Sequence, residues 1–357
     1  MTDERADAAR SRAIEEALRE CVVTGVAPAA SAWIWHDGRV VAEAAAGTAI
    51  APGAGPASKG TVFDVASLTK PFVAAVVHRL AAEGMISLSA ALPFAPGATI
   101  EDALAHRAGF QAWLPLHERI PDALVGTREA RLIAIAAAAS EGPVRPPRAI
   151  TEYSDLGFIA IIPAIEEAAG AGLAAAVASL VAGPLCLESA AFRPGGRGPH
   201  DPGSIAATED VPRRGGVIRG EVHDDNAHAM GGVSSHAGIF STAADVGLLC
   251  AAFLESSIGR GGFLPREIAE RAIAPVAPGC RTPGWDVRSA EGSSAGARMG
   301  GRTFGHLGYT GCSAWVDPDA RVVVVLLTNR VHPTSANEAI RAWRPAFHDL
   351  AFEVATS

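Results

Sequence analysis

The sequence has almost no lysine. Of its 30 basic residues only two, Lys59 and Lys70, are lysines, and the rest are arginines. Arginine keeps its proton near neutral pH, whereas a buried lysine can lose it. The lysine retained in the segment Ser67-Leu68-Thr69-Lys70 therefore indicates a position that needs either an amine able to lose its proton or a compact ammonium group.

Several other features are missing. The five cysteines are scattered and show no CxxC spacing, which argues against a disulfide framework or a zinc knuckle. No stretch approaches the roughly 18 apolar residues of a membrane span, and no apolar signal region follows the charged start Met1–Arg5. The net charge of −8 does not favour binding to nucleic acid. We therefore expect a cytoplasmic protein without nucleic-acid or membrane partners, although a misassigned start codon that removed a signal peptide would give the same sequence. The sequence does not indicate an oligomeric state.

Hydrophobic periodicity predicts strands near both ends of the chain and helices between them. Asp37-Gly38 is a strong hairpin-turn signal, and the β-branched run Val322–Val325 is typical of a strand. The predicted elements are a helix over 3–24, a hairpin over 31–47, a connection over 51–61, a helix over 68–84, a second hairpin formed by 312–316 and 321–327, and a helix over 335–353.

The middle of the chain, 66–220, is rich in alanine, the best helix former, and its clearest predicted helices are 133–139 and 157–185. We expect an α+β fold: an antiparallel sheet of five or more strands, flanked by the N- and C-terminal helices, with an inserted and mostly helical subdomain. The sheet subdomain would comprise 1–62 and 221–357, and the helical subdomain 63–220. The active site would lie in the cleft between them.

Residues three apart on a helix share one face, so Ser67 would place a hydroxyl nucleophile beside the Lys70 amine. Taken alone, this short pattern is more often an ordinary helix start with a solvated lysine. Other segments give it weight. The chain has only two tyrosines: Tyr153 follows a Pro-Pro loop and precedes a predicted helix, and Tyr309 lies just before a predicted strand.

Together these segments resemble the motifs of the serine β-lactamase-like superfamily, in its class C β-lactamase, penicillin-binding protein and family VIII esterase branch. The similar segments, in the order of the family, are Phe63–Lys70, Leu104–Phe110, Tyr153–Gly157, Gly231–Val246 and His306–Gly308.

The resemblance implies roles for these residues. Ser67 would form an acyl-enzyme, with Lys70 and Tyr153 transferring its proton, and a Lys70 ammonium would lower the pKa of Tyr153. The backbone N–H groups of Ser67 and Tyr309 would form the oxyanion hole. His306 and Gly308 would belong to the third motif, and Asp155 and Leu307 would contact the substrate. A small-molecule acyl substrate is implied, with neither cofactor nor metal.

Two departures from the family pattern matter. Asp155 stands where the family has asparagine, and a carboxylate cannot donate to a substrate carbonyl as an amide does; it could instead hold Lys70 charged. His306 stands where lactamases have lysine, and a mostly neutral imidazole binds a carboxylate less well, although Arg302 could compensate. These changes favour an esterase-type hydrolase of small acyl esters over an efficient β-lactamase.

Other functions remain open. A β-lactamase or a penicillin-binding-type carboxypeptidase or transpeptidase is the alternative within the enzyme class, and a non-catalytic binding protein is the alternative outside it. The His/Asp-rich stretch 221–236 could be a structural loop, a substrate-contacting rim or a metal site, and a zinc hydrolase would use His223, Asp224 and His236. Specificity is expected in the loops 110–150 and 192–228.

Overall fold

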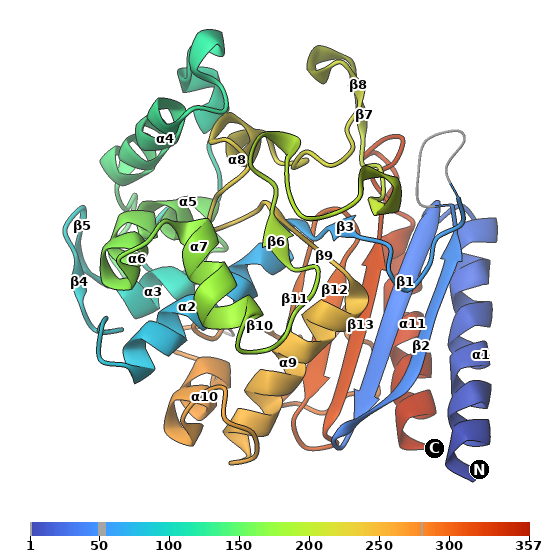
Figure 1. Cartoon of the computed structure of the whole chain (residues 1–357). Coiled ribbons are helices and arrows are strands. Elements are labelled where there is room, and N and C mark those ends of the chain that lie inside the picture. The colour runs from blue at the N-terminus through green and yellow to red at the C-terminus, as the bar shows by residue number, and fades with distance from the viewer. Residues whose placement is uncertain (1, 49–54, 280) are drawn as a thin grey trace.

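The computed structural model of the protein describes residues 2–48, 55–279 and 281–357. Its centre is a six-stranded antiparallel sheet in the order β10-β11-β12-β13-β1-β2 (Figure 1). Trp33 lies opposite Val325 where β1 and β13 pair, so strands from both ends of the chain meet in one sheet, as predicted. The strands are β1 Ala29–His36, β2 Arg39–Gly47, β10 Asp286–Val287, β11 Phe304–Leu307, β12 Ser313–Asp317 and β13 Val322–Thr328.

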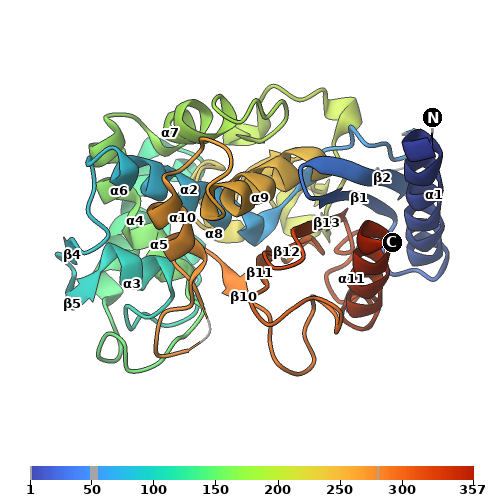
Figure 2. The same cartoon turned by 90° about the horizontal axis from the view of Figure 1, so that it is seen from below.

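Helices cover both faces of this sheet (Figures 1 and 2). The terminal helices α1 (Thr2–Val23) and α11 (Ile340–Thr356) pack on one face, and α9 (Ala243–Ser257) packs on the other. Strand β13 is buried along its whole length, which is why its sequence is a continuous apolar run rather than an alternating one. Helix α9 approaches closely because Gly247 has no side chain: a Cβ there would lie 2.1 Å from the Trp33 ring.

The described helices and strands that lie between β2 and β10 in the chain are mostly short. The strands outside the main sheet are β3 Phe63–Asp64, β4 Ala91–Leu92, β5 Ala95–Thr99, β6 Ala191–Phe192, β7 Asp210–Val211, β8 Gly216–Val217 and β9 Ile239–Ser241. The helices are α2 Thr69–Ala82, α3 Ile100–Leu104, α4 Arg128–Glu141, α5 Asp155–Ala160, α6 Ile162–Ala169, α7 Leu173–Val177, α8 Asp225–Ala229 and α10 Arg266–Ile273.

The α+β class, the large antiparallel sheet, both hairpins and the N-terminal helix are confirmed. The single helix expected over 157–185 is wrong: the chain breaks after α6 because Gly170 adopts the left-handed conformation, with φ of 61°. The C-terminal helix begins at Ile340 rather than 335. Part of the connection predicted over 51–61, residues 51–54, lies outside the described residues.

Within the part of the chain that the structure describes, we find no single helix long and apolar enough to cross a membrane. One bent pair of helical segments, Asp155–Ala169 and Leu173–Ala182, meets the criteria by length and composition when the two are taken together.

Candidate active site

Ser67 lies at a tight turn between β3 and α2. The preceding residue, Ala66, has a φ of +48°, a conformation that costs a non-glycine residue about 1 kcal/mol or more and needs support from its surroundings. That support includes the buried Asp64 carboxylate, whose Oδ1 accepts from the Ala66 N–H at 2.8 Å and whose Oδ2 accepts from the His223 N–H at 2.7 Å. Burial raises the pKa of Asp64 against the effect of these two hydrogen bonds.

Lys70 lies one turn further along and is completely buried. Its Nζ donates to Tyr153 Oη and to Asp155 Oδ1, both at 2.7 Å, and lies 3.2 Å from Ser67 Oγ. A fourth oxygen, the His236 carbonyl, lies 3.3 Å away. Burial alone would lower the pKa of Lys70, but the Asp155 carboxylate and Tyr153 outweigh it, so this pKa is raised. Lys70 is therefore an ammonium group at neutral pH.

Two opposing effects set the pKa of Tyr153. The Lys70 ammonium does lower it, but desolvation of the buried phenol is larger, and the net pKa of Tyr153 is raised. Two further residues hold the ring. His106 lies against it with ring centroids 4.5 Å apart, and the Arg281 guanidinium lies 4.8 Å from the ring centroid. His106 Nδ1 also accepts from the Ser154 N–H at 2.9 Å, which fixes the chain beside Tyr153.

The third-motif segment approaches the nucleophile turn closely. A Cβ at Gly308 would lie 2.4 Å from the Val65 carbonyl oxygen, so only glycine allows the segment to reach the turn that carries Ser67. This approach places Leu307 and Tyr309 on the same cavity as Ser67.

His306 is buried and neutral. Burial, Lys70 and Arg281 together hold the pKa of His306 well below its usual value. Its Nδ1 lies 2.8 Å from the Leu307 carbonyl oxygen, to which a neutral ring donates. Its Nε2 has no hydrogen-bond partner among the residues that the structure describes.

A cavity of about 650 Å³ opens over these groups. Six of the eight predicted site residues line it. Lys70 does not line it but contacts three of these six, and Gly308 lies between the lining residues Leu307 and Tyr309 in the chain. The residues that line the cavity come from both of the predicted subdomains, whose boundaries stay a prediction. The lining residues are Ala66, Ser67, Trp113, Tyr153, Asp155, Glu209, His223, Asp224, Asp225, Ala237, Arg281, Asp286, His306, Leu307 and Tyr309.

Arg302 does not compensate for the missing lysine. It pairs with Asp319 at 2.8 Å, and its side chain is 71% exposed, away from the cavity lining. The guanidinium at the cavity is Arg281, which also lies 3.4 Å from Asp286. Sequence reasoning missed Arg281 because it lies outside every recognised motif. His106 lies in the similar segment Leu104–Phe110, but the sequence suggested no role for it.

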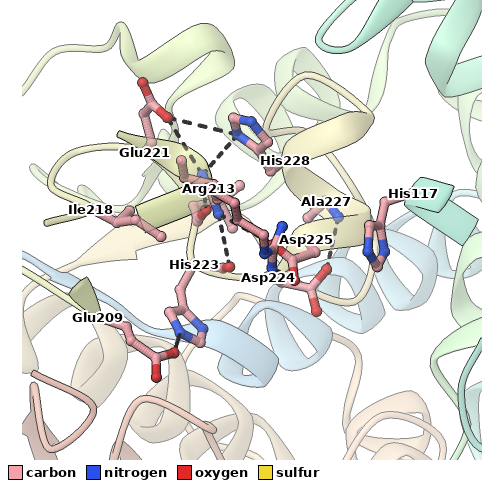
Figure 3. Close-up of polar contacts among 12 residues, drawn as sticks. His117, Glu209, Arg213, Ile218, Glu221, His223, Asp224, Asp225, Ala227 and His228 are labelled. Atoms are coloured by element: carbon pink, nitrogen blue, oxygen red, sulfur yellow. Dashed lines mark hydrogen bonds and ion pairs between the residues drawn. The ribbon is translucent and has the colours of Figure 1, made fainter. Parts of the chain in front are cut away.

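Three residues of the His/Asp-rich stretch, His223, Asp224 and Asp225, line the cavity. Figure 3 shows them with their polar neighbours. His223 Nε2 lies 2.8 Å from Glu209 Oε2, and His236 Nε2 lies 2.9 Å from Asp224 Oδ1. Asp225 pairs with Arg213. Across residues 2–48, 55–279 and 281–357, we find no group of three or more His, Cys, Asp or Glu side chains arranged to hold a metal ion.

Among the curated relatives that the chain resembles, the two described below are each matched over about half of their length. The chain is 32% identical over 211 residues to a Salmonella gallinarum (strain 287/91 / NCTC 13346) protein named "Putative D-alanyl-D-alanine carboxypeptidase", covering 54% of this chain and 48% of that protein. It is 30% identical over 200 residues to the N-acetylmuramyl-L-alanine amidase of Bacillus subtilis (strain 168), covering 50% and 44%. The chain thus spans about half the length of the curated relatives it matches.

Solved structures show the same fold at low identity. EstCE1, described as a hydrolase with promiscuous acyltransferase activity, superposes with a TM-score of 0.76 at 21% identity, covering 97% of this chain and 99% of that one. The D-amino acid amidase of Ochrobactrum anthropi SV3 gives 0.71 at 18%, covering 97% of each chain. The Beta-lactamase family model matches residues 13–346. The chain therefore belongs to the Beta-lactamase family and has the fold of serine β-lactamases and penicillin-binding proteins.

Proposed function

We propose that the protein is a serine hydrolase that forms an acyl-enzyme at Ser67 and acts on small acyl esters. One observation carries the proposal: the buried Lys70 Nζ lies within reach of both Ser67 Oγ and Tyr153 Oη, at 3.2 and 2.7 Å, beside a cavity large enough for a small molecule. A hydroxyl nucleophile needs a neighbouring proton acceptor to attack an acyl carbonyl at neutral pH.

The raised pKa values of Lys70 and Tyr153 mean that both groups carry their protons at rest. The acceptor is then the minor form in which the Tyr153 phenol is ionised, and the Lys70 ammonium stabilises this phenolate. Ser67 Oγ bonds to the acyl carbon while its proton passes to Tyr153 Oη. The tetrahedral intermediate then expels the leaving group, which takes that proton, and water repeats the sequence to release the acid.

Backbone donors would stabilise the intermediate. We assign the N–H groups of Ser67 and Tyr309 to the oxyanion, since Gly308 lets the two segments meet. One such donor lowers the barrier by roughly 2.7 to 4 kcal/mol. Asp155 acts mainly on Lys70, which it holds charged at 2.7 Å, rather than on the substrate amide.

Amide hydrolysis is the second candidate. It is supported by the names of the two curated relatives, a carboxypeptidase and an amidase, at 32% and 30% identity. The same acyl-enzyme would form, and an amine instead of an alcohol would leave with the proton.

The test compares the wild type with Ser67→Ala, in the presence of EDTA, on p-nitrophenyl butyrate and on a peptide ending in D-Ala-D-Ala. Ester cleavage that vanishes in the variant supports the esterase, and cleavage of the peptide alone supports the second candidate. Equal rates in both proteins contradict an acyl-enzyme at Ser67. No turnover of either substrate points to a binding protein, and activity that EDTA removes and zinc restores points to a metal hydrolase.

A further inference from the structure

The buried residue His236 is not used by the proposed chemistry, yet it contacts Lys70. Its carbonyl oxygen lies 3.3 Å from Lys70 Nζ. Its ring is 1% exposed and uses both nitrogens: Nδ1 lies 2.8 Å from Ser234 Oγ, and Nε2 lies 2.9 Å from Asp224 Oδ1. The set resembles a catalytic triad in composition, but Ser234 is completely buried, so no substrate can reach its hydroxyl.

The chain around His236 runs along the nucleophile turn. The Val65 N–H donates to the Ile239 carbonyl at 3.1 Å, and the Ile239 N–H donates to Thr69 Oγ1 at 3.1 Å. The backbone from His236 to Ile239 therefore forms a support for the start of α2, and the His236 carbonyl is the part of it that contacts Lys70.

Asp224 fixes the other end of the His236 ring. Its Oδ1 also accepts from the Ala227 N–H at 2.7 Å and so caps helix α8. Burial opposes ionisation of Asp224, but His236 and the cap outweigh it and hold the pKa of this carboxyl far below its usual value. Its neighbour His223 donates its N–H to Asp64, which supports Ala66. Residues 223 and 224 thus brace both the turn of Ser67 and the carbonyl beside Lys70.

The third N–H of Lys70 has two candidate acceptors. An ammonium group has three hydrogens, and Tyr153 and Asp155 take two of them at 2.7 Å. The His236 carbonyl at 3.3 Å and Ser67 Oγ at 3.2 Å then compete for the third. A hydrogen bond donated to Ser67 Oγ engages the lone pair that must attack the substrate, so an acceptor that draws this N–H away favours attack.

We propose that Asp224 and His236 are a positioning pair for the catalytic lysine: their hydrogen bond holds the His236 carbonyl against Lys70 Nζ and so sets how the ammonium group is shared with Ser67. The inference rests on the proposed function, in which Lys70 assists Ser67. It gives the His/Asp-rich stretch a role that needs neither metal nor direct contact between His236 and substrate.

Two substitutions separate this role from simple packing. The amide nitrogen of Gln at 236 can occupy the place of imidazole Nε2 and keep the bond to Asp224, whereas the shorter Asn reaches only the place of Nδ1, beside Ser234. Because misplacement of about 1 Å near the reacting groups can cost about a hundredfold in rate, we expect His236→Asn to lower kcat at least about tenfold and leave KM within about twofold. His236→Gln should stay within about threefold of the wild-type kcat.

The scarcity of lysine supplies a readout that does not depend on activity. With ¹⁵N-lysine labelling, only Lys59 and Lys70 give side-chain ammonium signals, and Lys59→Arg assigns them. We expect His236→Asn to move the Lys70 Nζ signal and His236→Gln to restore it, while the half-exposed Lys59, paired with Glu43, stays unchanged as the internal control.

The outcomes are distinct. Equal effects of Asn and Gln on kcat, or an unmoved Lys70 signal in His236→Asn, would overturn the positioning role. Activity retained in Ser67→Ala would instead overturn the proposed function, whatever the lysine signals show. If His236→Asn does not fold, Asp224→Asn gives the same test, because its amide oxygen can still cap α8 while its bond to His236 loses the carboxylate charge; wild-type kcat and lysine signals in that variant would also contradict the proposal.

Discussion

Asp155→Asn restores the residue type of the family's second motif, and we expect it to destabilise this protein. Asp155 is the carboxylate partner of the completely buried Lys70 ammonium. At the observed separation of 2.7 Å, with an effective dielectric constant of about 20, the pair attracts by about 6 kcal/mol. Part of that attraction offsets the desolvation of both charges, and breaking a buried pair from one side typically costs about 3–5 kcal/mol.

The cost has an upper limit that depends on pH. The ordinary pKa of a lysine amine is 10.5, so removing its proton at pH 7 costs about 5 kcal/mol of free energy. The variant can therefore fold with Lys70 neutral when burying the unpaired charge would cost more. In the wild type the raised pKa of Lys70 contributes stability that is present below 10.5 and is lost as pH rises through the raised value.

In Asp155→Asn the pH dependence of folding stability has the opposite sign. With its counter-charge gone, burial lowers the pKa of Lys70, and the unfolded chain then binds more protons than the folded one below pH 10.5. The stability of the variant rises with pH by up to about 1.4 kcal/mol per unit. We expect Asp155→Asn to lower the free energy of unfolding by about 3–5 kcal/mol at pH 7. At pH 9 this loss should be smaller by up to about 3 kcal/mol.

Urea unfolding of the wild type and Asp155→Asn at pH 7 and pH 9 measures this difference. Asp286→Asn is the matched control, because it removes a carboxylate that lines the same cavity and pairs with Arg281, and arginine does not lose its proton in this range. A loss that is equal at both pH values, or a variant as stable as the wild type, would refute the reasoning about Lys70.

Four further predictions follow from the site. Gly308→Ala should lower kcat about a hundredfold in a folded protein, because the new methyl group would meet the Val65 carbonyl oxygen at 2.4 Å; circular dichroism and ester kinetics check it. His106→Leu removes the acceptor of a buried N–H and should cost about 1–3 kcal/mol in urea unfolding. Arg281→Ala should change kcat/KM for esters at least about threefold, whereas Arg302→Ala, on the surface, should not; equal effects would contradict the assignment. With the pKa of Tyr153 raised, kcat/KM should increase by up to about tenfold per pH unit above pH 7, and a flat profile would exclude its phenolate as the acceptor.

The sequence predicted best what depends on neighbours in the chain. Ser67 and Lys70 are three residues apart on one helical turn, so their contact follows from helix geometry. Tyr153 and the third motif came from the resemblance, which supplies long-range placement that spacing cannot. The meeting of both chain ends in one antiparallel sheet followed because apolar β-branched runs at both ends must be covered and paired, whereas the order of the strands was not predicted.

What the sequence could not give is burial and contacts between distant segments. His236 meets Lys70 across 166 positions, and no local pattern marks that contact. The lowering of the Tyr153 pKa by Lys70 was predicted from the motif, whereas the larger desolvation of the phenol, which raises the net pKa, depends on the packing around it. Gly170 lies in an alanine-rich segment that is typical of a continuous helix, yet it adopts a left-handed conformation that ends helix α6.

The two departures from the family motifs act in the same direction on charge. Asp155 adds a negative charge where the family has a neutral amide, and its charge is matched by Lys70 at 2.7 Å. His306 removes a positive charge where lactamases have lysine, and its lowered pKa keeps it neutral. Arg281 is a cation on the cavity wall, but Asp286 and the face of Tyr153 already engage it. A substrate carboxylate would thus find weaker compensation here than a lysine provides, and under the proposed function we therefore expect uncharged acyl esters and amides to be better substrates than β-lactams.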